Sequence, residues 1–196
     1  MVKVWTFDGI TPVVAPSAFV HPSAVLIGDV IIGANVYIGP CASLRGDFGR
    51  LVVMAGSNIQ DGCVMHGYPD TETRVEENGH IGHGAVLHGC HVGRNAMIGM
   101  NAVIMDRAQI GESAIIAAAC FIKADMHIPP RMLVAGVPGR IVRALDESEI
   151  ARKTRGTETY QRLARKSLAS MREAIALTEI EPDRRRTNSL NDDPAT

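Results

Sequence analysis

The sequence predicts a β protein: a parallel β-helix built from hexapeptide repeats, followed by a C-terminal α-helix. The main observation is that every sixth residue from Val92 to Ile122 is aliphatic, with a small residue four positions after most of them. A period of six fits neither an α-helix nor a single strand, but it is a signature of β-helix solenoids. The aliphatic series is Val92, Ile98, Ile104, Ile110, Ile116 and Ile122, and the small residues are Ala96, Ala102, Ala108, Ala114 and Cys120.

The same pattern recurs nearer the N-terminus, from Val20 to Leu44, and in a shorter fragment from Val53 to Met65. Three hexapeptides close one triangular coil, with the aliphatic side chains inside and successive coils about 4.8 Å apart. The low aromatic content of 4% agrees with such narrow layers. A sandwich of short strands is the alternative fold. Several glycines that follow the aliphatic residues are expected at corners with unusual backbone angles: Gly33, Gly39, Gly99 and Gly111.

The repeats predict a β-helix domain over residues 1–140. Their register breaks at residues 45–52 and again at residues 67–80, where a polar, turn-rich segment predicts a loop that leaves the coil. Pro129 and Pro130 follow the last repeat and are expected to close the solenoid.

A charged segment without the sixfold pattern predicts a C-terminal helical segment over residues 141–180. It is expected to form one helix, or two helices broken near Gly156, packed along the prism or over its open end. Residues 181–196 are polar and are expected to form a disordered tail. The candidate N-caps are Asp146 or Ser148 for the first helix and Thr157 for a second one.

Composition narrows the function classes. The net charge of −1 offers no basic surface for nucleic acid. No stretch approaches the ~18 apolar residues that a membrane span needs, and the first ten residues lack the apolar core of a signal peptide. The four cysteines show no CxxC spacing. We therefore expect a cytoplasmic protein with small, buried, reduced thiols and with no nucleic-acid or membrane partner.

Three histidines occupy positions that predict a shared metal site. His66 and His88 each follow an aliphatic core residue directly, so they take the same outward-facing position of a hexapeptide. They are 22 residues apart, which is one coil of 18 residues plus the interrupting loop. The two side chains should therefore stack on adjacent coils, about 4.8 Å apart at the backbone. His83 lies five residues before His88, across a corner, and would reach such a pair only in a second chain packed alongside.

A catalytic zinc ion needs three protein ligands and one open position. Three prisms around a threefold axis would close one such site at each interface, so the geometry predicts a homotrimer with active sites between subunits. The alternative is that each histidine is an ordinary solvated or interface residue. His80 and His91 lie close enough in the sequence to compete for the role of ligand.

Four motifs follow one another along the chain: SLRGD at 43–47, NIQDGCVMHG at 58–67, GHIGHGAVLHGC at 79–90 and IGMNAVIMD at 98–106. In this order, and over nearly the whole chain, they resemble the γ-carbonic-anhydrase-like family of hexapeptide-repeat proteins. The resemblance implies a left-handed β-helix, a trimer and a C-terminal helix. It also implies that the metal ligands are His66, His83 and His88.

Other residues acquire expected roles through the same resemblance. Arg45 and Asp47 resemble a pair that forms a salt bridge between subunits. Gln60 resembles the glutamine that orients metal-bound solvent, and the alternative is a hydrogen bond that caps an interface. Tyr160 matches an active-site tyrosine, and the alternative is an aromatic side chain that only packs the helix.

Within the family, residues 11–30 and 156–161 most resemble the branch that acts in phenylacetate degradation, with the carnitine-operon branch second. This implies a metal-dependent acyl-CoA thioesterase acting on ring-hydroxylated or ring-opened intermediates. The cofactor would be Zn²⁺, with Co²⁺ or Fe²⁺ as alternatives, and the metal would generate hydroxide at neutral pH. Residues 129–143 resemble the last coil of hexapeptide acyltransferases. The candidate contacts to CoA phosphates, which would otherwise pin the helix to the prism, are Arg131, Arg140 and Arg143.

Three other functions stay open at this point. They are a γ-type carbonic anhydrase, a CoA-dependent acyltransferase and a non-catalytic assembly protein. The acidic residues of the polar segment align with no proton shuttle of the family, which argues against rapid CO₂ hydration. These residues are Asp70, Glu72, Glu76 and Glu77.

Overall fold

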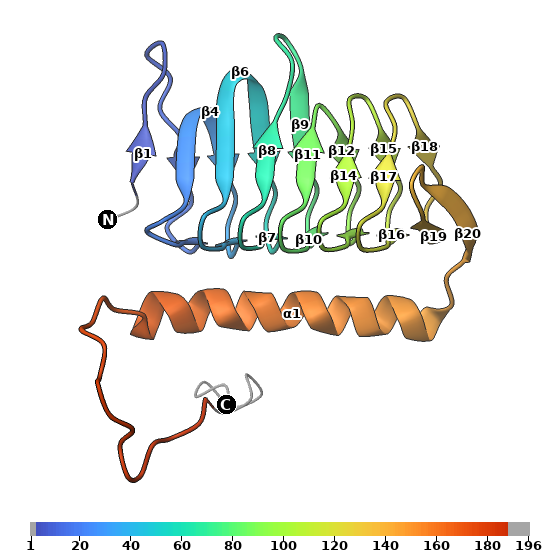
Figure 1. Ribbon diagram of the computed structural model, residues 1–196. Helices are drawn as coiled ribbons and strands as arrows, with labels where there is room; N and C mark the ends of the chain where they lie inside the picture. The colour runs from blue at the N-terminus through green and yellow to red at the C-terminus, as the bar shows by residue number, and fades with distance from the viewer. Residues whose placement is uncertain (1–2, 188–196) are drawn as a thin grey trace.

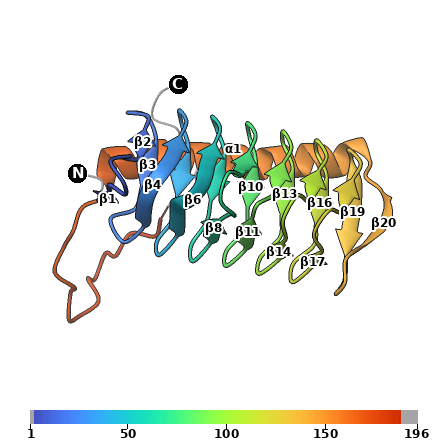
Figure 2. The same ribbon diagram turned by 90° about the horizontal axis from the view of Figure 1, so that it is seen from above.

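The computed structural model, which describes residues 3–187, is a prism of stacked coils (Figure 1). The aliphatic residues of the sixfold series are all buried inside this prism. All strand pairs between successive coils are parallel. The fold is the left-handed parallel β-helix that the repeats and the family resemblance predict. One helix among the described residues, α1 (Glu147–Ser170), runs back along the prism (Figure 2).

The strands form two sheets that cover three faces, because β4 (Val25–Ile32) and β6 (Ser43–Val53) bend around a corner and belong to two faces. Face A also contains β1 (Val4–Trp5), β8 (Val64–His66), β11 (Val86–His88), β14 (Val103–Ile104) and β17 (Phe121–Ile122). Face B also contains β2 (Val13–Val14), β9 (Glu72–Val75), β12 (His91–Val92), β15 (Gln109–Ile110) and β18 (His127–Ile128). Face C contains β3 (Phe19–Val20), β5 (Tyr37–Ile38), β7 (Asn58–Ile59), β10 (His80–Ile81), β13 (Met97–Ile98), β16 (Ile115–Ile116), β19 (Met132–Ala135) and the antiparallel β20 (Arg140–Ala144).

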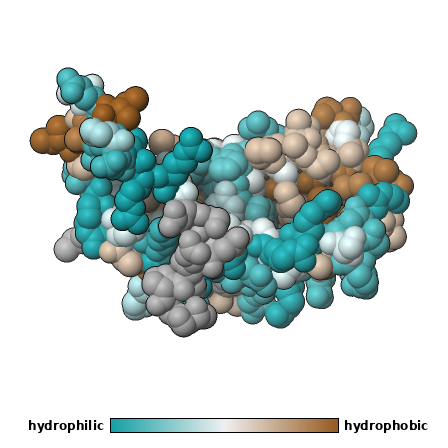
Figure 3. Space-filling model, turned by 90° about the horizontal axis from the view of Figure 1, so that it is seen from below, coloured by the Kyte–Doolittle hydropathy of each residue, from teal (hydrophilic) through white to brown (hydrophobic). Residues whose placement is uncertain are grey.

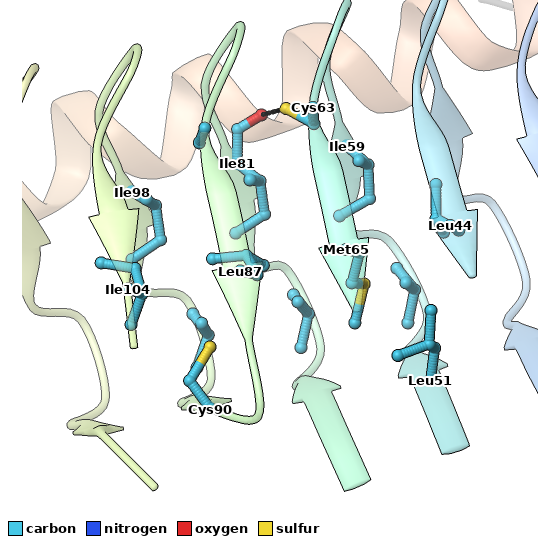
Figure 4. Packing of buried hydrophobic residues seen from close by; sticks show 14 of the residues in the cluster. Leu44, Leu51, Ile59, Cys63, Met65, Ile81, Leu87, Cys90, Ile98 and Ile104 are labelled. Atoms are coloured by element: carbon cyan, nitrogen blue, oxygen red, sulfur yellow. Dashed lines mark hydrogen bonds between the residues drawn. The ribbon is translucent and has the colours of Figure 1, made fainter. Parts of the chain in front are cut away.

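The core consists of columns of aliphatic side chains, each stacked on its equivalent in the next coil. Figure 4 shows Ile59, Ile81 and Ile98 in one such column, with Met65 and Leu87 in a second. These side chains are almost fully buried. Each is worth about 1.5–3 kcal/mol relative to an exposed position, so the columns hold successive coils in a fixed register.

The small residues four positions after the aliphatic ones are also buried, and three cysteines belong to this set: Cys63, Cys90 and Cys120. Burial raises the pKa of the Cys63 thiol to about 11 and that of Cys90 to about 12, so both stay protonated and inert at neutral pH. Cys41 departs from the expectation of buried thiols, because it lies exposed at a corner.

The corners correct the expected role of the glycines. Gly33, Gly39, Gly99 and Gly111 do not have positive φ angles. They are required for another reason: a Cβ atom at each would overlap the backbone of the next coil. The left-handed conformation falls two residues later in each repeat, at positions six residues apart that favour asparagine and aspartate. They include Asn95, Asn101, Arg107, Ser113, Ala119, Asp125 and Arg131.

The two register breaks are smaller than the sequence suggests. Residues 45–52 stay in the sheet, since β6 runs through them around a corner. Within residues 67–80, β9 pairs with β6 and β12, so only residues 67–71 leave the coil. Pro129 and Pro130 do not close the solenoid, because β19 pairs in parallel with β16 after them.

The helical segment is shorter than expected and unbroken. Residues 140–144 form β20 and residues 171–187 contain no helix, so only Glu147–Ser170 of the expected segment 141–180 is helical. Asp146 is the N-cap, with Glu149 completing a capping box. Gly156 does not end the helix, and Thr157 is a buried residue rather than a cap. The expected tail has no helix or strand up to residue 187, and its remainder lies outside the described residues.

Polar contacts anchor α1 beside face C. Lys153 donates from Nζ to the carbonyl oxygen of Asn78 (2.8 Å) and to Oδ1 of Asn95 (2.7 Å). Gln161 donates from Nε2 to the carbonyl oxygen of Gly56 (2.9 Å). Burial lowers the pKa of Lys153 to about 7. These contacts, together with apolar packing of Ala164 against face C, set which helix residues face the solenoid.

In Figure 3, hydrophobic surface gathers at the end of the solenoid that carries β20 and on the segment that projects after α1 at the other end. The exposed large hydrophobic residues include Trp5 and Phe7 in the first coil and Ile141 and Val142 in β20. No helix among residues 3–187 is long and apolar enough to cross a membrane.

We predict opposite effects for two glycine-to-alanine changes. Gly99→Ala should lower the free energy of unfolding by about 1–3 kcal/mol, because the new Cβ overlaps the backbone of Ala118. Gly156→Ala should raise it by about 0.5–1 kcal/mol, because the nearest atom to its Cβ is 4.0 Å away and alanine favours the helix. Urea unfolding at one fixed protein concentration measures both. Equal effects of the two changes would contradict this account of the corners.

Candidate functional site

His66 and His88 lie side by side on face A, as their positions in the repeats predict. They are paired directly in the register of β8 and β11. Their ring centroids are 5.3 Å apart. The His66 Nδ1 and His88 Nε2 atoms face each other at 3.4 Å.

The second nitrogen of each ring contacts a carboxylate. His66 Nε2 lies 3.0 Å from Asp47 Oδ1, and His88 Nδ1 lies 2.6 Å from Asp106 Oδ1. Burial raises the pKa of Asp47, but the hydrogen bond from His66 and the charge of Arg45 outweigh it, so that pKa lies below its usual value. Because the carboxylates accept from these two nitrogens, a neutral ring directs its lone pair at the other ring. We call His66, His88, Asp47 and Asp106 the paired-histidine group.

Two exposed aromatic rings flank the paired-histidine group. Phe48 packs against His66 with ring centroids 5.2 Å apart, and Tyr68 meets His88 edge-on at 5.1 Å. Arg45 lies next to the same group and forms an ion pair with Asp47 of its own chain, with 2.5 Å between Nη1 and Oδ2.

A second group lies at the opposite edge of face A, at the corner with face C. His83 Nδ1 is 3.1 Å from Asp61 Oδ2, and His83 Nε2 is 3.4 Å from the Tyr160 hydroxyl. Burial, followed by the charge of Asp61, raises the pKa of Tyr160 to about 12, so its hydroxyl stays protonated at neutral pH. Gln60 follows β7 at the same corner and is only 2% exposed. We call His83, Asp61, Tyr160 and Gln60 the corner group.

The structure therefore brings the candidate residues together in two groups rather than one. His66 and His88 meet, whereas His83 lies beyond a corner with Tyr160 and Gln60. Within residues 3–187, no three His, Cys, Asp or Glu side chains of one chain gather where they could hold a metal ion. Any site with all three histidines needs a second chain.

The other candidates have different surroundings. His91 contacts Glu76 on face B, and the partly buried His80 lies under α1. Of the arginines expected to contact CoA, Arg131 pairs with Glu147 and Arg143 pairs with Glu149 at the start of the helix. Arg140 is exposed in β20 and makes no ion pair with the described residues.

The acidic residues of the polar segment face other partners than the histidine groups. Glu72 and Glu76 both pair with Arg74, and Glu77 pairs with Arg94. Asp70 lies at the tip of the short loop, with a positive φ angle.

Sequence reasoning missed the partners of the histidines. Asp106 lies 18 residues after His88, one coil later, so the rule that pairs His66 with His88 would also have found it. Asp61 lies one coil before His83, with the short loop between them. The contacts of His80 depend on how α1 docks, and no periodic signal predicts them.

Comparison with known proteins agrees with this architecture. The family model described as bacterial transferase hexapeptide (six repeats) matches residues 11–46 and 89–124. The carnitine operon protein CaiE of Salmonella agona is 56% identical over 188 residues, which are 96% of this chain and 95% of that protein. CaiE of Escherichia coli O157:H7 is 57% identical over 188 residues, 96% of each chain.

Two solved structures are also similar. A putative acetyltransferase from Bacillus cereus is 30% identical with a TM-score of 0.83, over 84% of this chain and 96% of that chain. A hexapeptide transferase family protein from Anaplasma phagocytophilum is 36% identical with a TM-score of 0.80, over the same shares. With relatives of this identity over nearly its whole length, the chain belongs to the hexapeptide-repeat transferase family and is a homologue of the carnitine operon proteins CaiE.

Proposed function

We propose that the protein is a metal-dependent hydrolase of acyl-CoA thioesters, with each active site shared between two chains. The observation that supports this most directly is the paired-histidine group. His66 and His88 direct one nitrogen each at a common point, and a carboxylate holds the other nitrogen of each ring. This combination is typical of histidines that bind a metal.

The residues present fit a divalent metal ion. Two nitrogen ligands of a tetrahedral zinc, at bond lengths of about 2.0–2.1 Å, lie about 3.3–3.4 Å from each other. The measured separation of His66 Nδ1 and His88 Nε2 is 3.4 Å. Two neutral rings would otherwise oppose their lone pairs at this distance, so a cation between them removes a repulsion. Zinc, cobalt or iron suits such imidazole ligands.

His83 is the proposed third ligand, from a neighbouring chain. Its Nδ1 faces Asp61, as one nitrogen of each of the other two histidines faces an aspartate. Its Nε2, which lies 3.4 Å from the Tyr160 hydroxyl, is therefore the nitrogen that a metal would take. Carboxylate pairing alone is not selective, since His91 also has it. The corner group lies at the edge of face A opposite to His66 and His88. A second chain packed against this face would therefore bring its own His83 close to the His66–His88 pair of the first chain.

Face A offers the surface for such packing. Its outward positions between the two groups are mostly aliphatic, and none of them lies under α1, which contacts strands of face C. In the equivalent column of face B, Val13, Ile31 and Val52 are aliphatic but the four later positions are polar, so the larger apolar area to bury favours face A. In a closed ring of three copies, every interface would join the paired-histidine group of one chain to the corner group of its neighbour. The outward residues of face A are Val25, Ser43, Val64, Val86, Val103 and Phe121, and those of face B include Arg74, His91, Gln109 and His127.

The chemistry divides among these residues. A bound metal would supply a Lewis acid and lower the pKa of its water toward 7. Asp47, Asp61 and Asp106 hold the three rings in the tautomers that leave one nitrogen free. Gln60 offers an amide to orient the attacking water. Tyr160, whose hydroxyl stays protonated, offers a donor to the oxygen that becomes negative in acyl transfer.

The thioester substrate rests on two observations. Residues 129–143 resemble the last coil of hexapeptide acyltransferases, and the chain belongs to a transferase family. Because Arg131 and Arg143 are engaged by helix carboxylates, Arg140 is the arginine that remains available for a CoA phosphate. The proposed substrates are CoA thioesters of the ring-hydroxylated or ring-opened acyl groups of phenylacetate degradation. Because the chain is also similar to carnitine operon proteins, the test must include other acyl groups as well.

Acyl transfer to a hydroxyl or amine acceptor is the second candidate, favoured by the family and by the similarity to a putative acetyltransferase. It would use the same thioester but would exclude water as the acceptor. Carbon dioxide hydration would need the metal but no acyl group.

We predict that the protein releases free thiol from at least one acyl-CoA without any acceptor. A chelator should abolish the release, and Zn²⁺, Co²⁺ or Fe²⁺ should restore it. A thiol-detecting assay over a panel of acyl-CoAs, run beside CO₂ hydration, measures this. Thiol release only with an added amine or alcohol would instead indicate an acyltransferase, and CO₂ hydration alone would indicate a carbonic anhydrase.

We predict that His83→Ala and His88→Ala chains, each inactive alone, recover activity when they assemble together. In a cyclic trimer, one interface of every mixed assembly keeps all three histidines, so random mixing should restore about one quarter of the wild-type activity. His66→Ala mixed with His88→Ala is the matched control, because both changes affect the same group and no interface is intact. Recovery in the control, or none in the test, would rule out shared sites.

We predict that Asp106→Asn lowers metal affinity about 10- to 100-fold, because His88 loses the carboxylate that fixes its ring. Glu147→Gln is the control, since Glu147 pairs with Arg131 at the start of α1, away from both groups. Competition with a chromophoric chelator measures the dissociation constants. Unchanged affinity in Asp106→Asn would mean that His88 does not bind the metal.

A further inference from the structure

A buried polar cluster lies between face C and α1, next to the corner group. It consists of Asn58, Gln60, His80 and Thr157. Asn58, Gln60 and Thr157 are at most 2% exposed. Polar groups are costly at such positions unless they are hydrogen-bonded, so this cluster needs a reason.

The register of face C shows that the polarity is local. Asn58 and His80 are paired directly, and their neighbours in the same outward column are Tyr37 on one side and Met97 on the other. The same column is therefore occupied by an aromatic and a hydrophobic side chain on the adjacent coils. The polar pair occurs only on the two coils that contribute Gln60 and His83.

Both hydrogens of the Gln60 amide are used inside the cluster. Nε2 donates to Asn58 Oδ1 at 2.9 Å and to His80 Nε2 at 2.8 Å. The amide oxygen, Oε1, has no hydrogen bond with the described residues. It is the atom through which Gln60 can accept a hydrogen from water or substrate.

This arrangement requires one tautomer of His80. Because Nε2 accepts from Gln60, the proton of a neutral ring lies on Nδ1. Nδ1 lies 3.3 Å from the Thr157 hydroxyl and 3.3 Å from Asn58 Nδ2, and of these two only the hydroxyl can accept. Burial lowers the pKa of His80 to about 4, so the ring is neutral at physiological pH.

We propose that His80 is a positioning residue: with Nδ1–H donating to Thr157 of α1, it holds Gln60 so that the amide presents its oxygen, not its NH₂ group, to the active site. The catalytic consequence rests on the proposed function, whereas the tautomer does not. Helix α1 thereby determines, through one hydroxyl, which end of the glutamine faces the reacting groups.

The ¹⁵N spectrum of histidine-labelled protein tests the tautomer directly, with a His80→Gln sample to assign the signals. The expected result is a pyrrole-type Nδ1 and a pyridine-type Nε2 in the wild type. Thr157→Val should move the population toward Nε2–H, because Nδ1–H loses its acceptor. Thr157→Ser should restore the wild-type spectrum. A wild-type ring protonated on Nε2, or a spectrum unchanged in Thr157→Val, would overturn the proposal.

Kinetics test the consequence with the same variants. Thr157→Val should lower kcat about 10- to 100-fold with little change in KM, and Thr157→Ser should retain activity. Thr154→Val is the matched control on α1, since Thr154 contacts Asn95 and not His80. Thr157→Ala replaces Thr157→Val if the latter does not fold. A changed tautomer with an unchanged kcat would overturn the positioning role.

If the wild type hydrolyses no thioester, the proposed function fails, and the spectrum alone still decides the state of His80. If hydrolysis is present and the tautomer is the opposite one, this inference fails while the proposed function stands. The two failures are therefore distinguishable.

Discussion

The register between successive coils is the constraint on which the rest of this structure depends. Parallel pairing places each residue beside its equivalent in the next coil. Inward columns of aliphatic residues therefore form the core, and outward columns bring the side chains of the proposed site together. His66 and His88 share such a column, and they meet because Met65 and Leu87 are packed directly before them. A slip by one residue would exchange the inward and outward sets, exposing the core and burying the imidazoles.

This constraint explains which features the sequence predicts. The solenoid, the stacking of His66 on His88 and the separation of His83 all follow from counting residues along the repeats. The same counting applied to aspartates would have found Asp106. Counting does not explain the corners. The glycines after the aliphatic residues are needed because a Cβ atom there would overlap the next coil, and local backbone preferences do not reveal such a contact between coils.

The docking of α1 on the solenoid could not be predicted from the sequence. The cap of this helix at Asp146 follows a local rule, but its docking depends on long-range contacts such as those of Lys153 with Asn78 and Asn95. Consequently the sequence alone offers Thr157 as a second cap and leaves Tyr160 open between an active-site residue and a packing aromatic. Their contacts with His80 and His83 appear only when helix and prism are considered together.

The two halves of the proposed site therefore depend on different parts of the fold. The paired-histidine group is built from the solenoid alone, where parallel pairing and buried aliphatic columns fix every backbone position. The corner group also needs α1, held there by a buried lysine without a carboxylate partner among its hydrogen bonds. A buried cation is expensive to desolvate, and two carbonyl oxygens compensate only in part, as the pKa of about 7 for Lys153 indicates. The position of Tyr160, and through Thr157 and His80 that of Gln60, therefore depends on how α1 docks on face C.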